Sequence, residues 1–160
     1  MINLIKKILS IKKIYILPPK KNKILFIGSH NVNLFEKYII SNNHTICEIH
    51  SINLFILMIS FFRRYKNNIL INYYLNFIKY TKPKIVSTFV DNYVHFYFLK
   101  NFFPNVIFIS IQNGWRGEIG DLFEKKNIKK FDNLKSDYIL TLNDTIGKKY
   151  SEHIKHKKIK

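Results

Sequence analysis

The chain has 160 residues, which is the length of one domain with a sizeable hydrophobic core. Its net charge of +17 comes mainly from lysines scattered along the sequence. This scatter indicates a solvated surface and argues against a nucleic-acid-binding protein, whose cations cluster on one face. The single cysteine, Cys47, cannot form an internal disulfide, and the six histidines lack a paired ligand spacing such as HExxH. We therefore expect a reducing compartment and no metal or other cofactor.

Residues 1–20 are a basic segment in which apolar and lysine positions separate partly into two faces of a helix that Pro18 and Pro19 would end. Such a helix either lies on an anionic membrane surface or packs on its own domain. No apolar run followed by a small-residue cleavage site marks a secretion signal. The longest apolar run, residues 52–62, is about half of the roughly 20 residues that a membrane span needs, and it predicts a buried helix. We expect a cytoplasmic protein, either free or peripheral on the inner face of the cytoplasmic membrane.

From residue 21 onward, short apolar runs alternate with longer amphipathic stretches. Strands are predicted at residues 23–28, 44–50, 84–90, 105–114 and 136–142, and helices at residues 32–41, 54–65, 69–80, 91–104 and from residue 143 onward. Strands separated by helices need crossover connections, which make the strands parallel. The sequence therefore predicts an α/β fold over residues 21–160, a Rossmann-like three-layer domain with a central parallel sheet and helices on both faces.

Three loops are predicted at the edge of the sheet where ligands bind, and the first two have fewer candidate binding residues than the third loop. Residues 28–31 lack the GxGxxG spacing of a dinucleotide site, so we interpret them as a tight turn. Asp91 and Asn92 follow the strand at residues 84–90. Either residue can cap the next helix with its side chain. Alternatively, Asp91 faces the cleft, where it would hydrogen-bond a sugar hydroxyl or act as the general base that takes its proton.

The third loop, IQNGWRGEIGD, places unusual chemistry directly after a buried strand. Its candidate binding residues combine amide, aromatic, cationic and carboxylate groups with flexible backbone: Gln112, Asn113, Gly114, Trp115, Arg116 and Glu118. An aromatic ring can stack on the C–H face of a sugar, amides can bond its hydroxyls, and an arginine fork can pair with phosphate or carboxylate. This mixture favours a ligand-facing loop; the alternative is that Trp115 is core buried between two domains.

Three segments of the chain resemble bacterial surface carbohydrate biosynthesis proteins, a family of GT-B-type, glycosyltransferase-like proteins. The segments are VSTFVDNYVHFYFLK, NVIFISIQNGWRGE and SDYILTLNDTIGKKYSEHI. With the opening PPKKNKILFIGS, the resemblance covers most of residues 18–154. In the family, one strand leads to a TF-[IV]-DN turn and another to an IQNG turn. The resemblance carries a substrate-binding role over to the residues of these turns: Asp91, Asn92, Gln112, Asn113 and Gly114.

The resemblance implies two Rossmann-like domains that face a cleft, of which this chain corresponds to the N-terminal, acceptor-side one. It implies transfer of sugar from a nucleotide-activated co-substrate to a glycan or lipid-linked acceptor. The C-terminal donor domain is absent from these 160 residues, so we expect either a truncated gene product or one half of a split enzyme whose partner chain carries that domain. In both cases we expect the chain to be inactive by itself.

Two other classes of function stay open. The chain could be a non-catalytic binding or assembly module whose cleft is completed by a partner, in which case an exposed apolar patch is expected. It could also be a basic nucleic-acid binder, which would need aromatic residues interleaved with clustered lysines. The sequence favours the first of these two.

Overall fold

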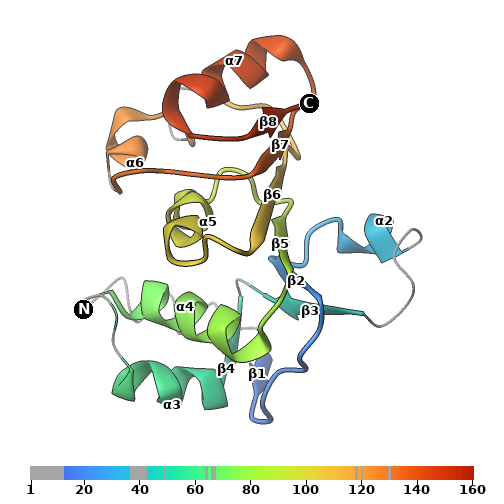
Figure 1. The fold of residues 1–160 in the computed structure, drawn as a ribbon, viewed down its shortest axis with the longest axis vertical. Coiled ribbons are helices and arrows are strands. Elements are labelled where there is room, and N and C mark those ends of the chain that lie inside the picture. The colour runs from blue at the N-terminus through green and yellow to red at the C-terminus, as the bar shows by residue number, and fades with distance from the viewer. Residues whose placement is uncertain are drawn as a thin grey trace.

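A computed structural model of the chain describes residues 13–36, 43–48, 50–63, 65, 68–117, 119, 121–129 and 131–160 (Figure 1). Most of the predicted N-terminal helix, residues 1–12, lies outside the described residues. The end of that segment is a strand, β1 (Lys13–Tyr15), which pairs in parallel with β4 (Ser51–Asn53). The helix prediction is wrong here because Ile14 and Tyr15 are branched and aromatic residues that favour extended backbone, and β4 offers them a pairing edge.

The centre of the fold is a six-stranded sheet in which all neighbouring strands are parallel, in the order β3-β2-β5-β6-β7-β8. Its strands are β2 (Ile24–Ile27), β3 (His44–Cys47), β5 (Ile85–Thr88), β6 (Ile107–Ile111), β7 (Tyr138–Leu140) and β8 (Lys158–Ile159). This confirms the predicted α/β fold with a parallel sheet. Strand β8 was not predicted, since its two residues lie in a lysine-rich tail without an apolar run.

The strand order reverses next to β2. The chain goes from β2 outward to β3 and then crosses back over β2 to β5. At such a reversal, the loops leaving the carboxyl ends of the two inner strands diverge and open a crevice in which α/β proteins bind ligands. Gly28, directly after β2, has φ 89°, a conformation that glycine adopts without strain and that turns the chain into this region.

Helices cover both faces of the sheet, so the domain is the predicted Rossmann-like three-layer structure. They are α2 (Val32–Glu36), α3 (Leu54–Phe62), α4 (Ile69–Thr81), α5 (Val94–Leu99), the 3₁₀-helix η1 (Lys100–Phe102), α6 (Lys125–Ile128) and α7 (Asp144–His153). Side chains of β2 alternate between the two faces: Leu25 and Ile27 join the large core under α4, α5 and α7, whereas Phe26 packs with Val32 and Phe35 of α2. Figure 1 shows α2 alone on its side of the sheet.

Helix α3 forms an outer layer on α4. The sequence predicted a helix here that is buried, and this is wrong for one side of it. Leu54, Met58, Phe61 and Phe62 are 38%, 59%, 53% and 88% exposed. Periodicity could not show this, because an all-apolar run has no polar face to mark the solvent side. No helix within the described ranges is long and apolar enough to cross a membrane.

The face of the sheet that carries α2 is less covered at β6 and β7. Ile107 and Tyr138 are 39% and 38% exposed, and Ile109, Ile111 and Leu140 are half-buried. Alternate residues of the same strands, such as Phe108 and Ile139, are fully buried on the other face. Parallel sheets are usually covered on both faces, so this strip is an unusual apolar surface.

A buried ion pair holds the amino ends of β6 and β7 together. Asp137 Oδ2 lies 2.6 Å from the ammonium of Lys100 and accepts a hydrogen bond from the Phe108 N–H at 2.8 Å, while its Oδ1 lies 2.9 Å from Lys157 Nζ. Lys100 Nζ also donates to the carbonyl of Val106 at 2.7 Å. Burial alone would raise the pKa of Asp137, but these donors lower it below its ordinary value.

Helix α5 begins at Val94, three residues later than the predicted start at Asp91. Its N-cap is Tyr93, and no side chain caps it. Helix α6 was not predicted at all, because its four residues are too few to show a helical period.

Candidate functional site

Three loops meet at the carboxyl end of the sheet, and we call them the loop cluster: residues 28–31 after β2, residues 91–92 after β5 and residues 112–117 after β6. The side-chain amide of Asn31 donates to Asn113 Oδ1 at 2.6 Å, and the Asn113 N–H donates to Asp91 Oδ1 at 3.2 Å. Asn31 has φ 55°, a left-handed conformation that asparagine tolerates better than most residues. The loops that flank the strand-order reversal are thus tied into one surface.

Asp91 is the centre of this cluster and is fully buried. Its carboxylate accepts hydrogen bonds from Arg116 Nε, at 2.5 Å to Oδ2, from Arg116 Nη2 and from the hydroxyl of Tyr150. Its main-chain carbonyl accepts a hydrogen bond from the hydroxyl of Tyr97 at 2.7 Å. Asp91 is therefore neither the cap of α5 nor an open carboxylate in the cleft; it is an internal acceptor that joins loops and helices.

The guanidinium of Arg116 is a forked partner of Asp91, with its remaining contacts also inside the protein. Nη1 donates to the carbonyl of Trp115 at 2.7 Å and lies 3.5 Å from Asp121 Oδ2. Burial would lower the pKa of Arg116, but the hydrogen bonds and charge of Asp91 raise it, so the side chain stays charged. The sequence predicts that the guanidinium of Arg116 binds a phosphate or carboxylate of a ligand, but in the structure it binds the carboxylate of Asp91.

Two tyrosine hydroxyls donate to Asp91, that of Tyr150 to the carboxylate and that of Tyr97 to the main-chain carbonyl. Tyr150 comes from α7 and Tyr97 from α5, and both are fully buried. Burial raises the pKa of both hydroxyls above the ordinary tyrosine value, and the charge of Asp91 raises them further. Both hydroxyls therefore keep their protons and act as donors. Tyr97 also shares a hydrogen bond of 2.7 Å with the hydroxyl of Ser110 on β6.

Gln112 fixes the start of the third loop. Its side chain is almost fully buried, donates to the Gly114 carbonyl at 2.8 Å and accepts from the Leu142 N–H at 2.8 Å. It thereby joins the loops after β6 and β7. Gly114 closes this turn, and a Cβ there would only meet Arg116 Nη1 at 4.0 Å, so space does not demand a glycine.

Trp115 and Asn92 are the predicted residues that face outward. Trp115 is 79% exposed, so it is not core buried between domains in this chain. Asn92 is exposed and hydrogen-bonds Asp121. Although burial alone would raise the pKa of Asp121, N–H donors of Leu122 and Gly117 and the charge of Arg116 lower it. Glu118 lies outside the described residues.

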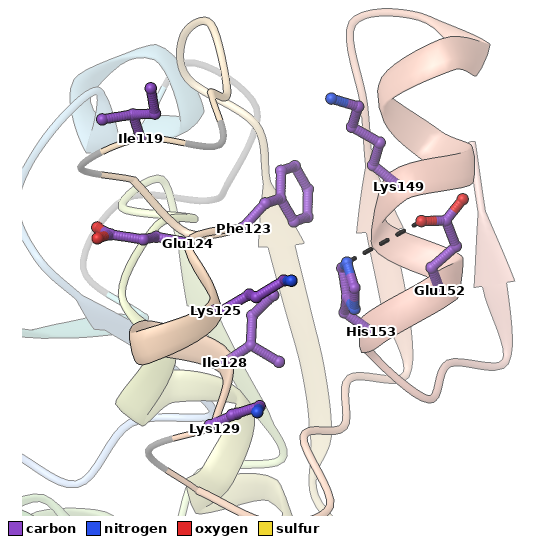
Figure 2. Close-up of a pocket in the computed structure, with 9 residues that line it drawn as sticks. All are labelled: Ile119, Phe123, Glu124, Lys125, Ile128, Lys129, Lys149, Glu152 and His153. Atoms are coloured by element: carbon purple, nitrogen blue, oxygen red, sulfur yellow. Dashed lines mark ion pairs between the residues drawn. The ribbon is translucent and has the colours of Figure 1, made fainter.

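A groove of about 710 Å³ opens between α6 and α7. Figure 2 shows its two walls, with Phe123 between them and the lysine side chains of both helices directed toward the gap. The Phe123 ring centroid lies 5.1 Å from that of Tyr150, whose hydroxyl donates to the Asp91 carboxylate. The ring of Tyr150 therefore lies between the groove and Asp91. Its lining residues are Ile119, Phe123, Glu124, Lys125, Ile128, Lys129, Lys149, Glu152 and His153. It has an apolar floor and a charged rim, without the amides of the loop cluster.

Sequence reasoning missed Asn31, Asp121, Tyr97 and Tyr150 as members of the site. The place of Asn31 after the first inner strand is a signal for a ligand loop, but the loop lacks the GxGxxG spacing that would mark it as a dinucleotide site. The two tyrosines carry no local signal, since they lie on apolar helical faces. Within the described residues, no group of three or more His, Cys, Asp or Glu side chains could hold a metal ion.

One comparison with known proteins gives a match. Residues 109–160, from within β6 to the last residue, match a family described as "putative O-antigen biosynthesis protein". The matched part includes Gln112 to Arg116, Asp121 and Tyr150, but not Asp91 or Asn31. It agrees with the resemblance to surface carbohydrate biosynthesis proteins and does not specify a glycosyltransferase. No curated protein and no solved structure matches the chain.

Proposed function

We propose that this chain is the acceptor-side, carbohydrate-binding part of a glycosyltransferase-like protein of surface polysaccharide biosynthesis. The loop cluster would hold a sugar of a glycan or lipid-linked acceptor, and a nucleotide-activated sugar bound by a donor domain would supply the group that is transferred. The similarity of residues 109–160 to an O-antigen biosynthesis family supports the role in polysaccharide synthesis.

The exposed Trp115 carries the proposal. A tryptophan that is 79% exposed contributes little to the stability of the domain, and its ring is free to stack on the C–H face of a sugar. It lies at the carboxyl edge of the sheet, where α/β domains bind ligands. Asn31, Asn92 and Asn113 supply amide groups for hydroxyls from the same surface.

The buried pair beneath this surface holds it in shape. Because Asp91 and Arg116 link the loops after β5 and β6, the position of Trp115 is fixed through the Arg116 contact to its carbonyl. A preorganised surface loses less conformational entropy when a ligand binds. Asp91 and Arg116 are thus positioning residues, and no side chain of the loop cluster is assigned as the catalytic base.

Isothermal titration calorimetry with O-antigen polysaccharide freed of its lipid tests this function. The wild-type chain should bind the glycan, Trp115→Ala should bind roughly tenfold more weakly since a stacked ring contributes about 1 kcal/mol or more, and Trp115→Phe should retain part of the affinity. Ile119→Ala is the matched control, because Ile119 is 94% exposed near the same loop and should leave affinity unchanged.

Nucleotide sugars provide the contrasting ligand. If the chain binds a nucleotide sugar through Trp115 and ignores the glycan, the loop cluster is a donor site and the acceptor-side proposal fails. If neither ligand binds, or if Trp115→Ala and Ile119→Ala weaken binding equally, the proposal fails as well.

The second candidate function is a binding or assembly module, and the open face of β6 and β7 favours it. Ile107 and Tyr138 lead an apolar strip that a partner chain would cover. Sedimentation velocity of the chain distinguishes the two functions. A stable complex that dissociates in the Ile107→Lys variant, together with a lack of glycan binding, would favour the binding or assembly module.

A further inference from the structure

Helix α3 presents an apolar stripe to the outside of the domain. Its exposed residues are Leu54, Met58, Phe61 and Phe62. Their spacing places them on one side of the helix, since residues three and four apart are neighbours on a helical surface. On the opposite side, Ile56 and Ser60 are completely buried.

The composition of α3 is unusual for a surface helix. Its sequence LFILMISFF has no charged residue, and the hydroxyl of its one polar residue, Ser60, donates inward to the Ile56 carbonyl at 2.7 Å. A helix that is apolar all round is normally covered on all sides. Helix α4 packs against one side of α3, and the apolar stripe is the side of α3 that stays exposed.

The segment around β1 extends this surface. Ile14, Ile16 and Leu17 are 62%, 74% and 78% exposed. The side-chain amide of Asn53, the N-cap of α3, donates to the Leu17 carbonyl at 2.8 Å, so the segment runs past the start of the helix. Figure 1 shows β1 and α3 together at the end of the molecule opposite α7. We call these residues and the α3 stripe the α3 surface.

Cations accompany the α3 surface. Arg63 is the C-cap of α3, Lys13 begins β1, and Lys79 Nζ lies 3.5 Å from the centroid of the Tyr65 ring just beyond α3. Residues 1–90 contain fourteen Lys and Arg and only two acidic residues. These two are Glu36, which pairs with His44 at 3.4 Å, and Glu48, and neither belongs to α3 or β1.

We propose that the α3 surface docks on an anionic lipid bilayer. The stripe would enter the boundary between headgroups and acyl chains, and the surrounding Lys and Arg side chains would meet lipid phosphates. Lipid offers both an apolar layer and negative charge. A second copy of this chain would instead bring the same cations face to face, and neither Glu36 nor Glu48, the two acidic residues of residues 1–90, belongs to α3 or β1 to offset their repulsion. This inference is independent of the function of the loop cluster.

Vesicle co-sedimentation of the full chain tests the docking surface. We expect binding to vesicles of equal parts phosphatidylcholine and phosphatidylglycerol at least about tenfold tighter than to phosphatidylcholine alone at about 0.15 M salt. Phe61→Ser with Phe62→Ser should weaken binding at least about tenfold, since each ring buries apolar area in the bilayer. Leu142→Ser is the matched control: Leu142 is 68% exposed on the loop after β7 and should not affect binding.

A second measurement reports depth directly and does not depend on loss of binding. In a Trp115→Phe background, Phe62→Trp places the chain's one tryptophan on the stripe. Its fluorescence should shift to the blue and be quenched by brominated lipid, whereas wild-type Trp115 should show neither change. The proposal is overturned if Phe62→Trp stays unquenched, or if wild type and the double variant sediment equally. It is also overturned if the double variant converts a stable dimer into a monomer while wild type ignores vesicles.

Discussion

Arg116 Nε donates to Asp91 Oδ2 at 2.5 Å across a sequence separation of 25 residues, and this contact joins the loops of two neighbouring strands. The carboxylate is fully buried, and the guanidinium side chain is 10% exposed. Through this pair and the Asn113 N–H, which donates to Asp91 Oδ1, the loop after β6 is held against the loop after β5.

Removing either charge of the buried pair should be costly. We expect Asp91→Asn or Arg116→Met to lower the free energy of unfolding by about 3–5 kcal/mol, because the partner is left as an uncompensated buried charge. Urea unfolding followed by circular dichroism measures this. Asp132→Asn is the control, since Asp132 is exposed and should change stability by less than about 0.5 kcal/mol. A loss below about 1 kcal/mol at Asp91 would contradict the assigned role.

The hydroxyl of Tyr150 offers a milder test of the same network. Tyr150→Phe removes one donor to the Asp91 carboxylate and keeps the ring that packs on Phe123. A hydrogen bond to a charged group contributes about 1.5–3 kcal/mol, so the urea midpoint should fall accordingly. Tyr15→Phe, at an exposed position on β1, should leave the midpoint unchanged. Equal effects of the two variants would show that the Tyr150 hydroxyl is not a donor to Asp91.

The ion pair of Asp137 and Lys100, at the amino ends of β6 and β7, should make the free energy of unfolding depend on pH. The pKa of Asp137 is lowered in the folded state. Its contribution is therefore complete above the ordinary aspartate pKa of 3.8 and is lost as the pH falls below that value toward the folded-state pKa. Urea midpoints of wild type and Asp137→Asn should differ most near neutral pH and converge below about pH 4. A difference that widens on acidification would have the wrong sign.

Two aromatic residues of one segment should respond in opposite ways. Phe123 is 6% exposed, and Phe123→Ala should cost about 3–5 kcal/mol through the cavity that it leaves. Trp115 is 79% exposed, and Trp115→Ala should change stability by less than about 0.5 kcal/mol. Thermal unfolding of both variants measures the contrast. A large loss at Trp115 would mean that the ring packs on the domain and is not available for a ligand.

Much of the fold could be predicted because its signals are local. The apolar runs that end at Gly28, at Asp91 and at Gln112 are read directly as buried strands, and parallel strands bring their carboxyl ends to one edge. The short elements β1, β4, β8 and α6 gave no such signal. The short strands form where a neighbouring strand has a free edge, and α6 forms within a loop between two longer elements. Neither condition shows in the periodicity of apolar residues.

The candidate site was predicted only in its outline. The sequence places Asp91 and Arg116 on neighbouring loops, but neither role that it predicts for the carboxylate, a helix cap or a group facing the cleft, is the buried one that the structure shows. What decides its role is Tyr150, which reaches Asp91 from a helix 59 residues further along the chain. Such a contact follows from the packing of α7, which is tertiary structure and leaves no pattern in the loop itself.

The most direct test of the loop cluster uses the indole N–H of Trp115. The chain has one tryptophan, so a ¹⁵N-labelled sample gives one indole signal that needs no assignment. Titration with lipid-free O-antigen oligosaccharide should shift this signal in a saturable way, together with the side-chain amide signals of Asn31 and Asn113. An unmoved indole signal, with shifts only among residues of the groove between α6 and α7, would contradict a carbohydrate site at the loop cluster.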